Sequence, residues 1–246
     1  MKIVVVGGTG LIGSQVIPLL RASGHDAEPA SPSTGVDTVT GEGLARALTG
    51  ADVVVDVTGS RDLDPEAAMT FFTRSADHLF AAEREAGVRH HVVLSIVGVD
   101  QVPDYGYYRA KVAQEQAARD SEVPFTIVRT TQFFEFVAPV MDLSTRGTEV
   151  RLSSQPLRPI ASADVAAAVA DAATDEPAYG IRNVTGPEVY TLDRLAELTL
   201  AAKPDGRTVV RDESAGLFAG MPDVLTGSGT KAEVAPTRYE DWLTHG

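Results

Sequence analysis

The sequence contains no cysteine. Disulfide bonds, thiolate catalysis and cysteine-ligated metal sites are therefore excluded. Its five histidines include no pair spaced one helical turn apart, which is the usual pattern of a histidine metal site on a helix. The sequence therefore predicts a protein without a metal centre.

Long apolar runs are also missing, because no uninterrupted run reaches the length that crosses a membrane. The chain enters a short β-branched run, Ile3 to Val6, almost at its start. No basic region followed by an apolar stretch and a cleavage site precedes that run. We therefore expect a cytoplasmic protein with no membrane partner.

Positive charge is in deficit, since 21 Lys and Arg residues stand against 34 Asp and Glu residues, for a formal net charge of −13. Such a surface repels nucleic acid, so we expect none as a partner. An anionic cofactor would have to be held by local dipoles and a few placed groups. The expected partner is a small-molecule substrate, and the sequence leaves a homodimer open.

Apolar runs alternate with amphipathic stretches along the first two thirds of the 246 residues. The runs predict strands and the stretches predict helices. The predicted strands are 3–6, 25–30, 51–57, 90–96 and 124–130, and the predicted helices are 11–22, 65–86, 105–120, 161–173 and 192–202. This alternation is typical of the α/β class, as a Rossmann-type doubly wound parallel sheet with ligands at the carboxyl ends of its strands.

The alternation loosens from about Thr131, where prolines break the chain into short pieces. We expect residues 1–246 to form a single Rossmann domain. Parts of 131–160 and 187–246 are expected to form a small C-terminal lobe that binds substrate.

A glycine-rich turn lies between the first predicted strand and the first predicted helix. It reads GGTGLIG and contains both G-x-G-x-x-G and the G-x-x-G-x-x-G variant. In this context the motif predicts a dinucleotide site, with the pyrophosphate at the helix N-terminus. The cofactor-binding residues expected here are Gly7, Thr9, Gly10, Leu11, Ile12 and Gly13.

The choice of dinucleotide depends on the residues just after the second predicted strand. No acidic residue lies about 20 positions beyond the turn, where NAD-binding proteins carry one. The hydroxyls of Ser31, Ser33 and Thr34 lie there instead, and they favour NADP, although no Lys or Arg lies between positions 21 and 46. NAD is the alternative, with Asp37 as the ribose ligand, although we expect Asp37 in the next strand.

Tyr107 and Lys111 lie four residues apart on a predicted helix and so share one face. Ser95 ends the preceding strand, at the edge where such a sheet places its ligands. The three suit carbonyl reduction: Tyr107 would donate the proton, Lys111 would lower the pKa of that tyrosine and contact the nicotinamide ribose, and Ser95 would orient the carbonyl. The plainer alternative is an amphipathic helix with a packed tyrosine and a solvated lysine.

Together these motifs resemble the short-chain dehydrogenase/reductase superfamily, in particular its atypical and extended members grouped with NmrA-like NAD(P)-binding proteins. The segments that carry the resemblance are GGTGLIG, DVTGS at 56–60, LSIVGVD at 94–100, YYRAKVAQEQ at 107–116 and FTIVRTTQFFEF at 125–136. The basic residue that many NADP-using relatives carry after the second strand is absent.

The resemblance implies further roles. Val57, Thr58 and Gly59 would border the adenosine side of the cofactor, and Thr130 would lie beside the nicotinamide. Gln132, Phe133 and Phe134 would bind the substrate. Phe136 would line the same apolar pocket, but for this residue we favour the alternative of ordinary core packing.

Two functions of different classes are consistent with this pattern. The first is an NAD(P)H-dependent oxidoreductase that reduces a small carbonyl or quinone-type substrate by hydride transfer, with Tyr107 as proton donor. The second is a non-catalytic NAD(P)-binding redox sensor of the NmrA type, which requires different affinities for the oxidised and reduced dinucleotide. Epimerase or dehydratase chemistry on a nucleotide sugar is less well supported, because the second lobe is short and has no obvious basic cluster.

Overall fold

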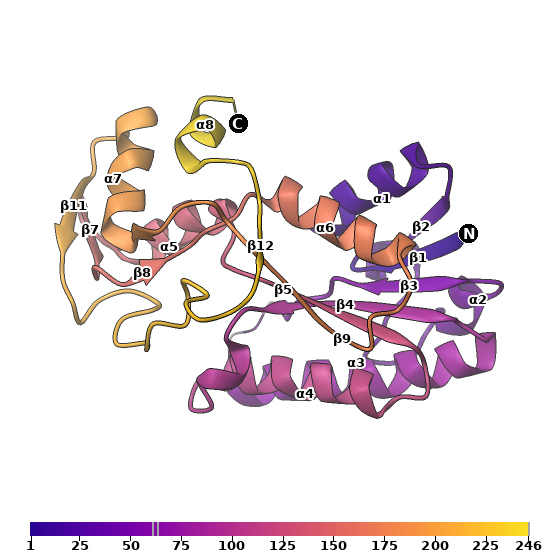
Figure 1. Ribbon diagram of the computed structural model, residues 1–246. Helices are drawn as coiled ribbons and strands as arrows, with labels where there is room; N and C mark the ends of the chain where they lie inside the picture. The colour runs from indigo at the N-terminus through magenta and orange to yellow at the C-terminus, as the bar shows by residue number, and fades with distance from the viewer. Residues whose placement is uncertain (61, 63, 246) are drawn as a thin grey trace. The chain divides into compact units, whose positions relative to one another are not determined.

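The computed structural model describes residues 1–60, 62 and 64–245 (Figure 1). The chain divides into two compact units. Unit 1 consists of Met1–Arg129 and Val165–Arg182, and unit 2 of Thr130–Asp164 and Asn183–Gly246. The segments for which the sequence predicts a small lobe fall in unit 2.

The largest sheet has seven strands in the order β12-β9-β5-β4-β3-β1-β2. Its strands are β1 (Lys2–Val6), β2 (Asp26–Ala30), β3 (Val53–Asp56), β4 (His90–Ile96), β5 (Phe125–Thr130), β9 (Gly180–Thr185) and β12 (Glu233–Val234). β1 lies between β2 and β3 and pairs with both in parallel, so the strand order reverses at β1. The predicted Rossmann-type parallel sheet is confirmed, and the reversal at β1 is the place where this fold binds ligands.

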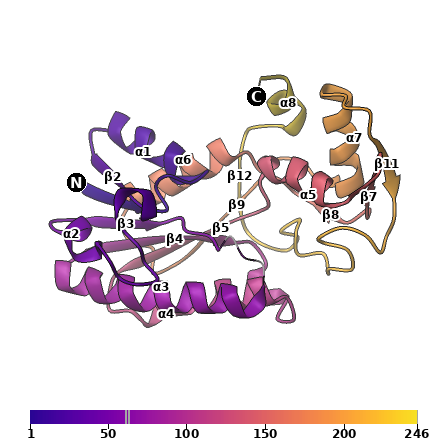
Figure 2. The same cartoon turned by 180° about the vertical axis from the view of Figure 1, so that it is seen from behind.

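The helices of unit 1 cover both faces of the sheet. They are α1 (Gly13–Ala22), α2 (Leu44–Leu48), α3 (Pro65–Ala86), α4 (Gly106–Asp120) and α6 (Ser162–Thr174), the last of which begins in unit 2. Figures 1 and 2 show α3 and α4 together on one face and α1 and α6 on the opposite face. The sheet is therefore doubly wound, as the sequence predicts.

Valine and isoleucine form the centre of unit 1. Ile3, Val5, Val54 and Val55 are fully buried. Strands with helices on both faces have no side exposed to water, which explains why they are continuous β-branched runs and not alternating patterns. β-Branched side chains also fit a pleated strand well.

Local signals set the ends of α3. The Asp64 carboxylate accepts hydrogen bonds from the backbone N–H groups of Glu66 (3.1 Å) and Ala67 (3.0 Å), which have no partner within the helix. Gly87 ends the helix in the left-handed conformation, with φ of 71°. The bounds predicted from the sequence, 65–86, are those of the structure.

Unit 2 is built from short elements. Its helices are α5 (Val137–Leu143), α7 (Leu192–Ala202) and α8 (Tyr239–His245), and its small strands are β6 (Thr145–Arg146), β7 (Glu149–Leu152), β8 (Pro156–Leu157), β10 (Tyr190–Thr191) and β11 (Thr208–Arg211). β7 pairs in parallel with β11 and in antiparallel with β6, which gives a mixed three-stranded sheet. Within the described part of the chain, no helix combines the length and the apolar character needed to cross a membrane.

Candidate functional site

A cavity of about 660 Å³ opens at the carboxyl ends of β1, β2 and β3 in unit 1, where the strand order reverses. Its lining includes seven residues that the sequence predicts as cofactor ligands: Gly7, Thr9, Gly10, Ser31, Val57, Thr58 and Gly59. This volume lies within the range typical of ligand pockets.

The glycine-rich turn forms one wall of this cavity. Gly7 has φ of +81°, a conformation that residues with a Cβ rarely adopt. A Cβ on Gly13 would lie 2.4 Å from the backbone oxygen of Gly7, so only glycine lets α1 start this close to the turn. Leu11 is 43% exposed and Ile12 is buried, and neither they nor Gly13 belong to the lining. The turn therefore presents backbone and Thr9 to a ligand, which suits a dinucleotide pyrophosphate.

The loop after β2 differs from the sequence prediction. Ser31 lines the cavity, but Ser33 and Thr34 do not. The Ser33 hydroxyl lies 2.9 Å from that of Ser31, and the Thr34 hydroxyl accepts a hydrogen bond from the Ser31 backbone N–H at 2.9 Å. Two of the three hydroxyls expected to bind a 2′-phosphate therefore hold the loop together.

Asp37 lies in this loop and lines the same cavity. The prediction that it belongs to a strand is wrong: its Oδ1 accepts hydrogen bonds from the backbone N–H groups of Val39 (2.8 Å) and Thr40 (3.3 Å). Such a turn is an alternative to strand pairing that aspartate side chains offer. The structure thus places a carboxylate in the lining of this cavity.

A buried chain of polar groups links α4 to the end of β3. The Lys111 ammonium donates to the Leu94 carbonyl oxygen (2.7 Å) and to Gln114 Oε1 (2.5 Å). Gln114 Nε2 in turn donates to Asp56 Oδ2 (2.7 Å), and Asp56 Oδ1 accepts from the backbone N–H and the hydroxyl of Thr58. This series of hydrogen bonds therefore ends at Thr58, a residue that lines the cavity.

Burial lowers the pKa of Lys111 to about 8, although the carboxylates of Asp56 and Glu115 oppose that shift. The ammonium also lies 4.8 Å from the centre of the Phe72 ring. Lys111 is thus a buried group with two hydrogen bonds, and the alternative of a solvated lysine is wrong.

Tyr107 reaches the edge of the cavity. Its hydroxyl lies 3.7 Å from the position that a Cβ would occupy on the lining residue Gly59, and its ring packs edge-on against Phe72. Burial raises the pKa of Tyr107 to about 12. The expected lowering of this pKa by Lys111 is not found, because the ammonium is directed at Leu94 and Gln114.

Ser95 lies beside the Glu115 carboxylate. The sequence predicts that it faces a substrate carbonyl. It is 3% exposed, and its hydroxyl, together with Arg129, lowers the pKa of Glu115. No hydrogen bond to the Ser95 hydroxyl is formed within the described residues. The catalytic role of Ser95 therefore stays a prediction.

The residues after β5 lie in unit 2. Thr130 is buried, and the Gln132 carbonyl oxygen accepts a hydrogen bond from the Ile160 backbone N–H at 2.9 Å. Phe134 is 1% exposed and packs against Tyr239 and Trp242, so it belongs to the unit 2 core and does not line a substrate pocket.

Phe136 behaves in the opposite way. Its ring is 48% exposed and stacks on Phe133 at 5.2 Å between ring centres, so the expectation of core packing is wrong for Phe136. The short helical turn over 134–136 exchanges the two roles, because it turns Phe134 inward and Phe136 outward.

Several lining residues were not predicted. They are Val6, Ala30, Pro32, Val36, Thr38, Ser60, Asp62, Ala67 and Phe71. Val6, Ala30 and Ser60 stand next to predicted strand ends and could have been found from that position. Ala67 and Phe71, four residues apart on α3, could not, because that helix lies far along the chain from the glycine turn. Across the described residues, no group of three or more metal-binding side chains comes together.

A family model described as NAD(P)H-binding matches residues 7–176, which is more than half of the chain. A reductase from Streptomyces griseus subsp. griseus, named for a (4-alkanoyl-5-oxo-2,5-dihydrofuran-3-yl)methyl phosphate, is 34% identical over 53% of this chain and 48% of its own length. The photosystem II assembly factor Ycf39 of Cyanophora paradoxa is 23% identical over 59% of this chain and 51% of its own. The chain thus spans about half the length of these relatives.

Among solved structures, a UDP-glucose 4-epimerase from Thermotoga maritima in complex with UDP-glucose superposes with a TM-score of 0.77. The match covers 99% of this chain and 96% of the epimerase at 16% identity, so it supports the fold alone. With the glycine turn at the reversal of strand order and the matching family model, the chain belongs to the NAD(P)H-binding family.

Proposed function

We propose that this chain is an NAD(P)H-dependent reductase of a small carbonyl or quinone-type compound, with Tyr107 as the proton donor. The observation that carries the proposal is the Tyr107 hydroxyl beside Gly59, a residue that lines the dinucleotide cavity. The reductase from Streptomyces griseus supports the reaction class.

A reduced nicotinamide in this cavity would supply the electron pair that a carbonyl carbon accepts. The chain must then provide a proton to the carbonyl oxygen. Tyr107 can fill this role because its hydroxyl lies at the cavity edge and, with its pKa raised to about 12, holds its proton throughout the neutral range. The raised pKa also makes it a weaker acid than a tyrosine whose pKa is near neutral. Lys111 has a positioning role: through Gln114 and Asp56 it holds the Thr58 segment at the cavity wall.

The test is oxidation of reduced nicotinamide with menadione and with benzaldehyde as acceptors, measured by absorbance. Tyr107→Phe is expected to lower turnover at least a hundredfold, which is the usual contribution of a general acid, and to leave dinucleotide affinity within about twofold. Tyr105→Phe, two residues earlier and half-buried, is the matched control and should keep turnover. Unchanged turnover in Tyr107→Phe would remove the tyrosine from the mechanism.

A second candidate is a non-catalytic redox sensor, and two observations favour it. The Lys111 ammonium is directed at Leu94 and Gln114 and not at Tyr107, and one group of relatives consists of assembly factors. A sensor must bind the oxidised and reduced forms with different affinity. Equal affinities in a titration with NAD⁺ and NADH, followed by nicotinamide fluorescence and calorimetry, would rule this candidate out.

For the choice of dinucleotide we propose NADH. Asp37 brings a carboxylate to the cavity, and no Lys or Arg belongs to its described lining. A carboxylate accepts hydrogen bonds from ribose hydroxyls and repels a 2′-phosphate. The sequence favoured NADP on the basis of three hydroxyls, and only that of Ser31 belongs to a lining residue.

Asp37→Asn tests this choice, because asparagine keeps the Oδ1 acceptor of the turn and removes the charge. Affinity for NADH is expected to fall about tenfold, and the preference over NADPH should shrink. Asp26→Asn, an exposed carboxylate on β2, is the control. Tighter binding of NADPH by the unaltered protein would contradict the proposal and direct attention to Arg46, whose Nη2 lies 3.3 Å from a Cβ placed on Gly35.

A further inference from the structure

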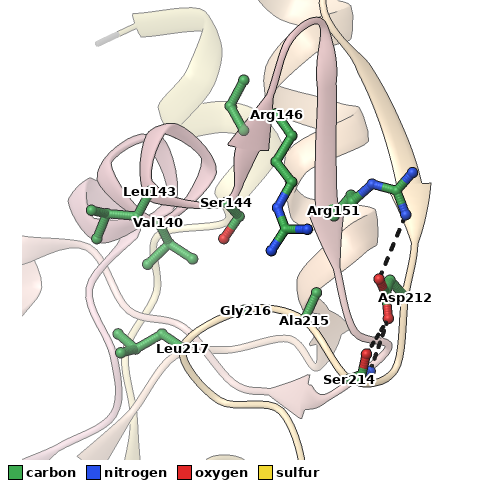
Figure 3. Close-up of a pocket in the computed structure, with 11 residues that line it drawn as sticks. Val140, Leu143, Ser144, Arg146, Arg151, Asp212, Ser214, Ala215, Gly216 and Leu217 are labelled. Atoms are coloured by element: carbon green, nitrogen blue, oxygen red, sulfur yellow. Dashed lines mark hydrogen bonds and ion pairs between the residues drawn. The ribbon is translucent and has the colours of Figure 1, made fainter.

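Unit 2 contains a cavity of its own, of about 480 Å³, that shares no lining residue with the dinucleotide cavity (Figure 3). α5 and the β6 segment form one side of it, and β7 and the loop after β11 form the other. Its volume is in the range of small-molecule pockets.

Two arginines from paired strands, Arg146 and Arg151, line this cavity. Arg151 is neutralised, because its Nη2 donates to Glu149 Oε2 at 2.6 Å and its Nη1 lies 3.6 Å from Asp212 Oδ2. Arg146 is different: it forms no ion pair with any residue that the structure describes. Its guanidinium points into the cavity between Ser144 and Arg151 (Figure 3).

Asp212 is the one acidic residue of the described lining, and its carboxylate already accepts hydrogen bonds from the protein. Asp212 Oδ1 accepts hydrogen bonds from the backbone N–H and hydroxyl of Ser214, at 3.1 and 2.7 Å, and these hydrogen bonds lower the pKa of the Asp212 carboxyl. Because Arg151 is paired with Glu149 and Asp212, Arg146 carries the one positive charge of the described lining that has no ion-pair partner, in a protein whose net charge is −13. The cavity is therefore complementary to an anion.

Large apolar side chains stand opposite the arginines. Leu143 is 77% exposed and Leu217 is 38% exposed, and Val140 lies between them at the cavity wall (Figure 3). These three side chains give the cavity an apolar wall opposite the Arg146 guanidinium. A ligand for this cavity would thus have an apolar body as well as an anionic group.

We propose that this cavity binds a small amphiphilic anion, a carboxylate or phosphate monoester on a short aliphatic chain. The Arg146 guanidinium pairs with the anionic group, since its planar donors match carboxylate and phosphate oxygens. The Ser144 hydroxyl lies beside it, and Leu143, Val140 and Leu217 cover the chain (Figure 3). The proposal is independent of the dinucleotide site and of the reductase activity.

The test is calorimetric titration of the full chain with octanoate and octyl phosphate, both below their critical micelle concentrations. Octylammonium and acetate are the comparison probes, because one reverses the charge and the other lacks the apolar body. Saturable binding of octanoate or octyl phosphate, with at least tenfold weaker binding of both comparison probes, is expected.

Arg146→Met keeps an unbranched stem and removes the charge, and it is expected to weaken binding at least tenfold. Arg74→Met, on α3 in unit 1, is the matched control and should bind as the unaltered protein does. Leu143→Ser should weaken octanoate binding several-fold without changing the weak binding of acetate.

Three outcomes would overturn the proposal. They are no binding of either amphiphile, equal binding of octylammonium, and equal affinity in the Arg146→Met and Arg74→Met proteins. Because Arg146 and Leu143 are exposed, both variants should unfold at the same urea concentration as the unaltered protein, and this control separates loss of binding from loss of folding.

Discussion

Gln114 Nε2 donates a 2.7 Å hydrogen bond to Asp56 Oδ2, and this contact joins the centre of α4 to the end of β3. Gln114 Oε1 accepts from the Lys111 ammonium, so one neutral side chain separates two buried charges of opposite sign. Both ends of the amide are therefore used, and the loss of this one side chain would affect both charges.

Replacement of Gln114 by methionine is expected to destabilise the protein by about 1–3 kcal/mol, because it leaves a buried carboxylate and a buried ammonium each short of a partner. Urea unfolding measures this cost. Gln116→Met is the matched control on the exposed side of the same helix, where the amide donates to the exposed Asp120 carboxylate, and it should change stability by less than about 0.5 kcal/mol. Equal stability of the two variants would show that the buried hydrogen bonds of Gln114 add nothing to the free energy of unfolding.

Lys111 should make the stability of the protein rise with pH above about pH 8. Its pKa is about 8 in the folded protein against the usual 10.5, so between these values the unfolded chain holds a proton that the folded chain has released. Stability therefore rises with pH through this window, by up to about 1.4 kcal/mol per pH unit from this group. The cost of burying the charged lysine is fully present below pH 8 and is relieved above it.

Lys111→Met should abolish this rise, and the measurement is the free energy of unfolding between about pH 7.5 and 10 for variant and unaltered protein. Above about pH 10 the sign reverses, because burial raises the pKa of Tyr107 to about 12 and its stabilising effect is lost as pH rises toward that value. Lys203→Met, an exposed lysine at the end of α7, should keep the slope. A slope that survives in Lys111→Met would contradict the assignment.

The same lysine shows what the sequence could and could not predict. The spacing of four residues placed Tyr107 and Lys111 on one face of α4, and the structure has them there. Gln114, three residues beyond, shares that face as well. The ammonium bonds to Gln114 because Asp56, 58 positions earlier than Gln114, holds that amide in place. The spacing of residues along α4 cannot predict the Lys111–Gln114 contact, because the contact depends on a residue so far away in the sequence.

Local signals set the helix ends in unit 1, whereas the short strands of unit 2 depend on contacts between residues far apart in the sequence. The bounds of α3 are set by Asp64 and Gly87, which are local signals and could be predicted from the sequence. β8 and β10 have two residues each and pair Leu157 with Tyr190, so neither is long enough to show a period. Their existence depends on a partner far along the chain, and propensity alone could not reveal it.

Glu115 and Arg129 form a buried ion pair with two hydrogen bonds. Arg129 Nε and Nη2 donate to the two carboxylate oxygens of Glu115, both at 2.7 Å, and the Glu115 side chain is 1% exposed. Arg129→Met is expected to cost about 3–5 kcal/mol in urea unfolding, because it leaves a buried carboxylate without its main partner.

Arg119→Met is the internal comparison, since Arg119 also contacts Glu115 at 3.0 Å but its side chain is 32% exposed. A partly exposed pair of this kind contributes about 1 kcal/mol or less. The double variant Glu115→Met/Arg129→Met removes both buried charges and should be more stable than Arg129→Met alone, since the cost lies in the lone charge and not in the lost attraction. If the double variant is instead less stable than Arg129→Met, the pair is a net source of stability, and the packing of α4 against β5 depends on its charges.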